Sequence, residues 1–313
     1  FIALQIMSNH VQMSYYFLFV ILFIVGAYFE DAWRNKTLPK FFKASAVVFV
    51  AALIGVAANL SNLYHTYTYS KETMRGKSEL VETGDAAKQT SSGLDRDYIT
   101  NWSYGIGETW TLLVPNFKGG SSSAPLSQSE TAMEKANPVY SSLYNSFPQY
   151  FGDQPWTAGP VYVGSFVLFL FVLGCFIVKG PLKWALLGAT FFSIVLAWGK
   201  NFMPLTDFFI DYIPMYNKFR AVSSILVITE FTIPLLAIFA LKRVLDEPGI
   251  WKKYKKAFGI SLALTAGVAL LLAVAPGSLG SDFVPAQETQ MLQNAVDRQM
   301  IPANELSGIL ANL

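Results

Sequence analysis

Charged side chains are scarce in this sequence. They make up 14% of its 313 residues, against roughly 25% in an ordinary soluble domain. Cys175 is the only cysteine, which excludes a disulfide within the chain. Two histidines, His10 and His65, do not form a zinc site with one cysteine inside an apolar run. We therefore expect no metal centre, and the net charge of +2 gives no reason to expect a nucleic-acid partner.

Motifs of several soluble enzyme classes are also missing. The sequence has no Gly-rich phosphate loop of the P-loop kind and no Gly-x-Ser-x-Gly elbow. It identifies no cofactor, which remains unknown at this stage. Function has to be inferred from polar residues next to apolar segments.

Long apolar runs dominate the sequence, and 53% of its residues are hydrophobic. Runs of 17 or more such residues are about long enough to cross a hydrocarbon core of roughly 30 Å. We predict an all-α integral membrane protein, a polytopic helical bundle of about six full spans and one partial span, with a large extracytoplasmic loop region. The partial span is 1–8, and the full spans are 12–30, 44–62, 161–178, 182–198, 221–241 and 257–275.

These spans divide the chain into four predicted regions. They are membrane helices at 1–63, a loop region at 64–160, membrane helices at 161–275, and the start of an extracytoplasmic segment at 276–313. Because Phe1 is followed at once by what looks like the end of an apolar helix, we expect the sequence to be an internal piece of a longer polypeptide.

The distribution of basic residues predicts an orientation. Twelve of the 23 Lys and Arg residues lie in three short segments, 31–43, 179–183 and 242–256. Short loops rich in Lys and Arg stay in the cytoplasm. The loop region 64–160 and the segment 199–220 are then extracytoplasmic.

Two groups of polar residues are predicted at the outer ends of spans. His10 and Gln12 precede the first full span, where they either donate hydrogen bonds to a phosphate or sugar, or cap the helix. Lys218 and Arg220 precede the span at 221, beside serines at a helix N-terminus that favours an anion. The alternative for this second pair is that basic side chains reach the lipid headgroups.

The loop region offers aromatic and acidic candidates. Trp102 and Glu108 lie in a run of alternating aromatic and small residues, which indicates either contact with a sugar ring or the core of a small folded loop. Residues 119–130 are rich in Gly and Ser and are interpreted as a linker. Glu230 is predicted near the middle of its span, where a carboxyl group is costly.

Several segments together give the sequence a family resemblance. They are Asn9–Gln12, Tyr98–Gly120, Tyr150–Pro155, Gly159–Gly164 and Met215–Arg220. In this order the chain resembles the YfhO-type bacterial membrane proteins, most closely their Bacteroidetes-type members, from residue 1 to about 245. His10 and Arg220 match the motifs of this family.

The family is similar to the GT-C class of glycosyltransferases. The resemblance implies transfer of a sugar from a polyprenyl-phosphate donor to a cell-envelope acceptor, at the outer face of the bacterial cytoplasmic membrane. It also implies a catalytic acidic residue in a loop before Phe1, so no catalytic residue is assigned here. We expect His10, Gln12, Trp102, Glu108, Lys218 and Arg220 to contact the donor phosphate or sugar.

Two other functions remain open from the sequence. A non-catalytic membrane scaffold would present the loop region to an envelope partner. A lipid or sugar transporter would need a polar path across the bilayer, and Glu230 with the helix-breaking Pro234 is its only support.

Overall fold

The structure is a computed structural model that describes residues 1–73, 75–76, 93–135, 137–138, 143–275, 277, 286–297, 302, 304 and 306–310. Across these residues the regular structure is helical, and the β-type pairing is limited to an isolated bridge between Pro125 and Pro148. The predicted all-α class is therefore confirmed.

The chain forms two compact units. The first combines Phe1–Ser103 with Phe166–Ser261, and the second combines Tyr104–Ser165 with Leu262–Leu313. These boundaries cut across the predicted division at residues 63 and 160, because the described part of 64–103 belongs with the apolar helices.

Within the described residues, four helices are long and apolar enough to cross a membrane. They are α2 (Val11–Arg34), α3 (Leu38–Ala57), η7 with α10 (Val222–Asp246), and α12 through α13 (Lys255–Val274). Helix α7 (Ser165–Ile177) is apolar but shorter. Such a set of apolar helices indicates a membrane protein.

The remaining elements are shorter. They are α1 (Ile2–Met7), α4 (Leu60–Lys71), α5 (Arg96–Thr100), η1 (Gly107–Leu112), η2 (Leu126–Gln128), α6 (Glu130–Lys135), η4 (Leu143–Asn145), α8 (Pro181–Ala197), η5 (Gly199–Phe202), α9 (Met203–Tyr212), η6 (Tyr216–Lys218), α11 (Ile250–Lys253), the π-helical η8 (Ala263–Gly267), α14 (Ala286–Asp297) and α15 (Leu306–Leu310).

The segment 199–220 differs from its prediction as an outer loop, because it contains helix α9. Helix α8 and the following Gly199–Tyr212 are bent by 107° relative to each other. Gly199 takes a φ of +47° at this bend, and the Ser103 hydroxyl accepts a hydrogen bond from the Lys200 N–H at 2.8 Å. The bend thus depends on a residue almost a hundred positions away, which no local pattern indicates.

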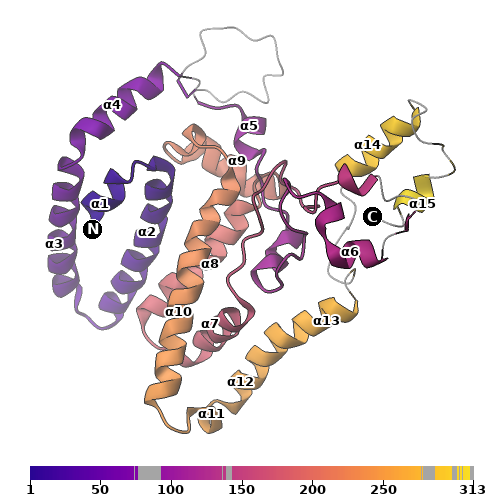
Figure 1. The fold of residues 1–313 in the computed structure, drawn as a ribbon. Coiled ribbons are helices and arrows are strands. Elements are labelled where there is room, and N and C mark those ends of the chain that lie inside the picture. The colour runs from indigo at the N-terminus through magenta and orange to yellow at the C-terminus, as the bar shows by residue number, and fades with distance from the viewer. Residues whose placement is uncertain are drawn as a thin grey trace. The chain divides into compact units, whose positions relative to one another are not determined.

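Helices α2, α8 and α10 pack side by side in the first unit (Figure 1). Small residues allow close approach: a side chain at Gly188 would contact Phe23, and one at Gly174 would contact Leu236. Two buried hydroxyl pairs link α8 to α10, namely Thr190 with Thr232 at 2.7 Å and Ser193 with Thr229 at 2.6 Å. Small and hydroxyl-bearing residues are typical of helix interfaces in membranes.

A second contact region lies at the other end of α10. Apolar residues of α7, α10, α11 and α12 form a core there: Leu170, Leu173, Ile177, Ala237, Ala240, Ile250 and Ala257. Arg243 donates to the Ile177 carbonyl and pairs with Glu247 at 2.9 Å. The basic turns that follow α7 and α10 therefore lie at the same end of the first unit.

The second unit corrects the interpretation of residues 119–130 as a linker. Backbone hydrogen bonds join this segment to 147–157: Leu126 N–H donates to the Phe147 carbonyl at 2.8 Å, and Ser122 N–H donates to the Thr157 carbonyl at 3.0 Å. A Gly- and Ser-rich composition also suits a tight return of the backbone, and here that geometry is fixed by pairing with a distant segment.

The hydroxyl pair Thr190–Thr232 can be tested directly. We expect Thr232→Val to lower the free energy of unfolding by about 0.6 kcal/mol, because Thr190 keeps a bond to the Leu186 carbonyl. Unfolding in mixed micelles is measured for Thr232→Val, for Thr190→Val and for the double variant. The departure from additivity gives the coupling energy between the two hydroxyl groups. Thr68→Val, on the exposed surface of α4, is the control. Strictly additive effects would contradict a direct bond.

Candidate functional site

Gln12 connects the beginning of α2 to the beginning of η7 and α10. Its Nε2 lies 2.9 Å from the Tyr16 hydroxyl, 2.9 Å from the Ser224 hydroxyl and 2.7 Å from the Arg220 carbonyl oxygen. Two segments more than 200 residues apart in sequence therefore start next to each other. Gln12 and Arg220, both expected to contact the sugar donor, lie next to each other, and it is the backbone of Arg220 that Gln12 contacts.

The backbone is strained around this junction. Asn9, Met215 and Ala221 adopt φ angles of 58°, 66° and 58°, although none of them is glycine. Such conformations cost on the order of 1–3 kcal/mol each and cluster at functional sites when the surrounding structure enforces them. Asn9 and Met215 also line the pocket described next.

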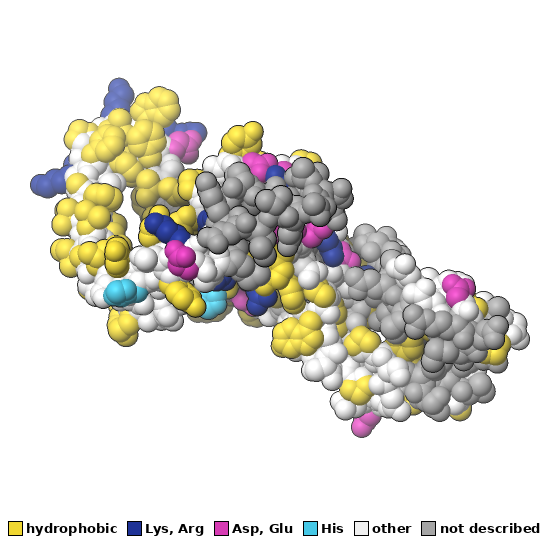
Figure 2. Space-filling model, turned by 90° about the horizontal axis from the view of Figure 1, so that it is seen from above, with side chains coloured by type: hydrophobic (Ala, Val, Ile, Leu, Met, Phe, Trp, Pro, Cys, Tyr) yellow, Lys and Arg dark blue, Asp and Glu magenta, His cyan; other side chains and the backbone are white. Residues whose placement is uncertain are grey.

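A pocket of about 1020 Å³ opens beside this junction. We call it the basic pocket, and its described lining residues are Asn9, His10, Val11, Gln12, Leu63, Thr66, Tyr67, Ser70, Lys71, Arg75, Gly76, Met215, Lys218 and Phe219. Figure 2 shows basic side chains and histidine near one another on the surface seen from above. Apolar side chains of α2 and of 215–219 form part of its wall.

Helix α4 supplies one side of the basic pocket. The lining residues Leu63, Thr66, Tyr67, Ser70 and Lys71 recur every three or four positions, so they share one face of the helix. The sequence did not single out these residues. Their spacing could have indicated a helix, but not which segment it faces.

Three basic side chains converge in the described lining, where no Asp or Glu occurs. The Lys71 ammonium lies 4.4 Å from the centre of the Tyr67 ring. Arg75 Nε donates to the Lys218 carbonyl at 2.9 Å, and Lys218 Nζ donates to the Arg75 carbonyl at 2.6 Å. Burial lowers the pKa of Lys218. Positive charge beside apolar surface, without a neutralising carboxylate among the described lining residues, favours an amphiphilic anion.

His10 caps α2, which was one of its two predicted roles. Its Nδ1 accepts a hydrogen bond from the Met13 N–H at 3.4 Å and so caps α2. An accepting Nδ1 places the imidazole proton of the neutral form on Nε2. His10 also lines the basic pocket, where an Nε2 proton is a hydrogen-bond donor.

Arg220 and Trp102 lie together, but not in the lining of the basic pocket. The Arg220 guanidinium donates to the Tyr98 hydroxyl at 2.7 Å and lies 5.5 Å and 5.6 Å from the centres of the Tyr98 and Trp102 rings. These contacts hold the α5 segment against the entry to α10. Arg220 is exposed, so this stack forms part of the surface.

The backbone N–H groups at the start of the predicted span 221–241 do not form the anion site that the sequence indicated. The N–H groups of Ser223 and Ser224 donate to the carbonyl oxygens of Trp102 and Ala221, each at 3.0 Å. The Ser224 hydroxyl donates to the Ala221 carbonyl as well. Donors committed to the protein backbone are not free for an anion, so the basic pocket replaces this helix terminus as the candidate site.

Glu108 belongs to the second unit and does not present a free carboxylate. Its side chain is buried, at 2% exposure. One oxygen accepts from the Tyr150 hydroxyl, and the other accepts from the Gly105 N–H at 2.5 Å and the Asp153 N–H at 3.3 Å. The prediction that Glu108 contacts a sugar is therefore corrected: it organises the core of its own unit, which was the alternative.

Glu230 lies inside the apolar helix Val222–Asp246, close to the predicted span 221–241. It stands in the first turn of the α-helical part, after the 3-10 turn η7, and its side chain is exposed. A carboxylate in a first helical turn interacts favourably with the helix dipole. The buried position that a transport path would need is therefore not observed.

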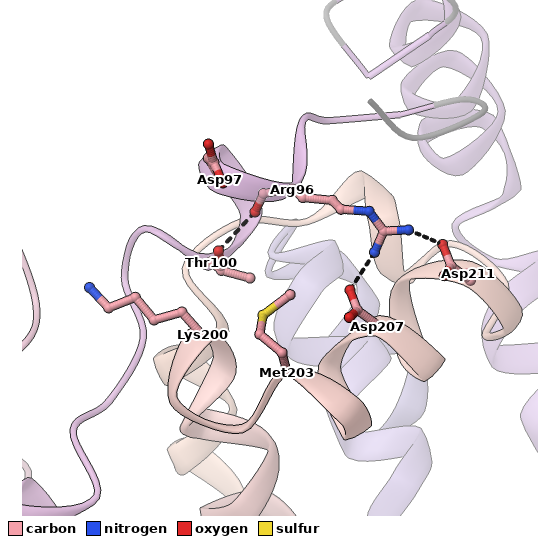
Figure 3. Close-up of a pocket in the computed structure, with 7 residues that line it drawn as sticks. All are labelled: Arg96, Asp97, Thr100, Lys200, Met203, Asp207 and Asp211. Atoms are coloured by element: carbon pink, nitrogen blue, oxygen red, sulfur yellow. Dashed lines mark hydrogen bonds and ion pairs between the residues drawn. The ribbon is translucent and has the colours of Figure 1, made fainter. Parts of the chain in front are cut away.

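A smaller pocket of about 600 Å³ lies between α5 and α9 in the first unit. Arg96 pairs with Asp207 at 2.6 Å and with Asp211 at 2.5 Å, as Figure 3 shows. The two carboxylates are one helical turn apart on α9. This clamp attaches α5 to α9 and was not expected, because α9 itself was not.

Comparison of the chain with protein-family models, with curated proteins and with solved structures gives no match.

The Glu108 core predicts a pH dependence of stability. Burial raises the pKa of the Glu108 carboxyl, although hydrogen bonds from Tyr150, Gly105 and Asp153 oppose the shift. The folded state therefore holds this proton more tightly than the unfolded chain, where the carboxyl titrates near 4.5. The contribution of Glu108 to stability is complete below that pH and is lost as pH rises through the higher folded pKa.

We expect Glu108→Gln to flatten this decline, because the amide does not titrate. Thermal unfolding of the intact protein across the range from about pH 4.5 to 8 measures the slope. Glu134→Gln, an exposed position on α6 in the same unit, is the matched control. Equal slopes for wild type and Glu108→Gln would show that the carboxyl does not titrate differently in the folded state.

Proposed function

We propose that this chain is part of a GT-C-like glycosyltransferase that uses a polyprenyl-phosphate-linked sugar to modify a cell-envelope acceptor. The observation that supports this most strongly is the basic pocket, in which Lys71, Arg75 and Lys218 lie beside apolar side chains. A lipid-linked sugar phosphate is complementary to such a pocket, because it carries an anion next to a long apolar chain. The resemblance to YfhO-type proteins, which rests in part on 9–12 and 215–220, supports the same assignment.

In this proposal each group of pocket residues has a role. The basic side chains and the Nε2 proton of His10 bind the phosphate oxygens, with charge-assisted hydrogen bonds from the cations. Val11, Met215 and Phe219 contact the lipid chain. As the sugar leaves, negative charge accumulates on the phosphate, and cations already fixed in place stabilise that charge in the transition state.

Arg220 and Trp102 have a supporting role in the proposal. Their stack with Tyr98 fixes the position of the segment leading into α10, and so of Lys218 two residues earlier. The general base is assigned to no residue of this chain. Glu108 is not proposed for it, because its oxygens are occupied within the core of the second unit.

The proposal places the basic pocket at the extracytoplasmic face of a bacterial inner membrane. Gln12 brings the starts of α2 and α10 together, so the Lys- and Arg-rich turns after these helices lie at the opposite end. By the positive-inside rule those turns are cytoplasmic. The finer assignment of six spans counts α7 and the bent pair of α8 and α9 as membrane segments.

Sugar transfer by the intact protein tests this function. We expect Lys218→Ala to slow release of polyprenyl phosphate on the order of tenfold or more, because one fixed cation at the leaving phosphate is lost. The assay supplies a panel of polyprenyl-phosphate hexoses to protein in nanodiscs and measures the released lipid phosphate.

Lys40→Ala is the matched control, since Lys40 is an exposed lysine at the opposite end of the first unit. Lys218→Arg should retain much of the activity if charge is what matters. Unchanged rates for Lys218→Ala, or no release from any donor, would contradict the proposal.

A further inference from the structure

The number of basic groups in the basic pocket exceeds what a phosphodiester requires. A sugar donor joined to a lipid through one phosphate is a phosphodiester with a single negative charge and two free oxygens. The described lining offers Lys71, Arg75 and Lys218 with no carboxylate among them. A terminal phosphate carries about −1.5 to −2 charges at pH 7 and has three free oxygens.

We propose that the basic pocket is selective for a phosphomonoester on a long apolar chain over the corresponding diester. This inference rests on the proposed function, and it identifies the lipid monophosphate product as the tightest ligand of the site. Preferential binding of the more negative group is what a site complementary to the leaving phosphate requires.

Hydrogen-bond capacity supports this selectivity. Lys218 uses one of its three Nζ protons on the Arg75 carbonyl, and Arg75 uses its Nε proton on the Lys218 carbonyl. Two ammonium protons and the four terminal guanidinium protons are then not engaged by these two bonds. The Lys71 ammonium lies over the Tyr67 ring, a contact that binds none of its N–H donors to a hydrogen-bond acceptor.

The mutual bonds of Arg75 and Lys218 also order the site before a ligand arrives. Each side chain is held by the backbone of the other, so residues 75 and 218 are fixed next to each other although they are 143 positions apart. A preorganised pair loses less side-chain freedom on binding than two mobile cations would. Helix α4 adds the third cation of the lining, Lys71.

Binding of two simple probes tests the selectivity. The intact protein in nanodiscs of neutral lipid is titrated at constant pH near 7.5 with dodecyl phosphate, a monoester, and with methyl dodecyl phosphate, the matched diester. We expect the monoester to bind about tenfold more tightly, because an additional charge interacts with several partly exposed cations. Inorganic phosphate, titrated in parallel, should bind much more weakly if the apolar wall contributes.

Two variants assign the effect to the pocket. Lys71→Gln should reduce the monoester preference several-fold, and since Lys71 is exposed, the melting temperature should not change. Lys40→Gln should leave the preference intact. Equal affinities for the two lipids would overturn the inference, as would a preference that survives Lys71→Gln combined with Arg75→Gln.

The outcomes separate this inference from the proposed function. If both lipids bind equally while sugar transfer still depends on Lys218, the transferase proposal stands and the selectivity is wrong. If the monoester is preferred but no donor is cleaved, the selectivity stands without the transferase. Binding of inorganic phosphate as tight as that of dodecyl phosphate would reject a lipid ligand and with it this inference.

Discussion

The contact of Gln12 with Ser224 and the Arg220 carbonyl determines where the candidate site forms. It connects the first turn of α2 to the turn that begins α10, and these two helices then run beside α8. The 213–221 segment is consequently held against the start of α2 with positive φ angles at Met215 and Ala221. Lys218 faces the basic pocket because its segment is fixed in this conformation.

Several polar interactions in the first unit join segments from distant parts of the sequence. Hydroxyl pairs join α8 to α10, Ser103 supports the bend at Gly199, and Arg96 connects α5 to α9. Each joins elements that apolar packing alone would leave free to slide, because nonspecific apolar contacts do not fix a register. Among the charged residues, Arg96 has this positioning role through Asp207 and Asp211 of α9.

The second unit uses a buried carboxylate for the same purpose. Glu108 binds the Gly105 and Asp153 N–H groups and the Tyr150 hydroxyl, which brings two stretches of the predicted loop region together. A side chain at Gly152 would collide with Glu108 and Tyr150, so the small residues in this run are required by packing. An acidic residue in a predicted loop region therefore need not be a reacting group.

The sequence alone determined the helical class and indicated the long apolar helices, because apolar length is a property of short segments. It also placed His10, Gln12 and Lys218 near the ends of apolar segments. It did not predict α9, the α4 face of the basic pocket, or the burial of Glu108. Those features depend on contacts between residues far apart in the chain, such as Arg75 with Lys218 and Glu108 with Tyr150. Only the tertiary structure shows which distant groups neutralise, enclose or expose a given side chain. For this reason the candidate site is the basic pocket, and not the neighbouring helix terminus at Arg220 that the sequence indicated.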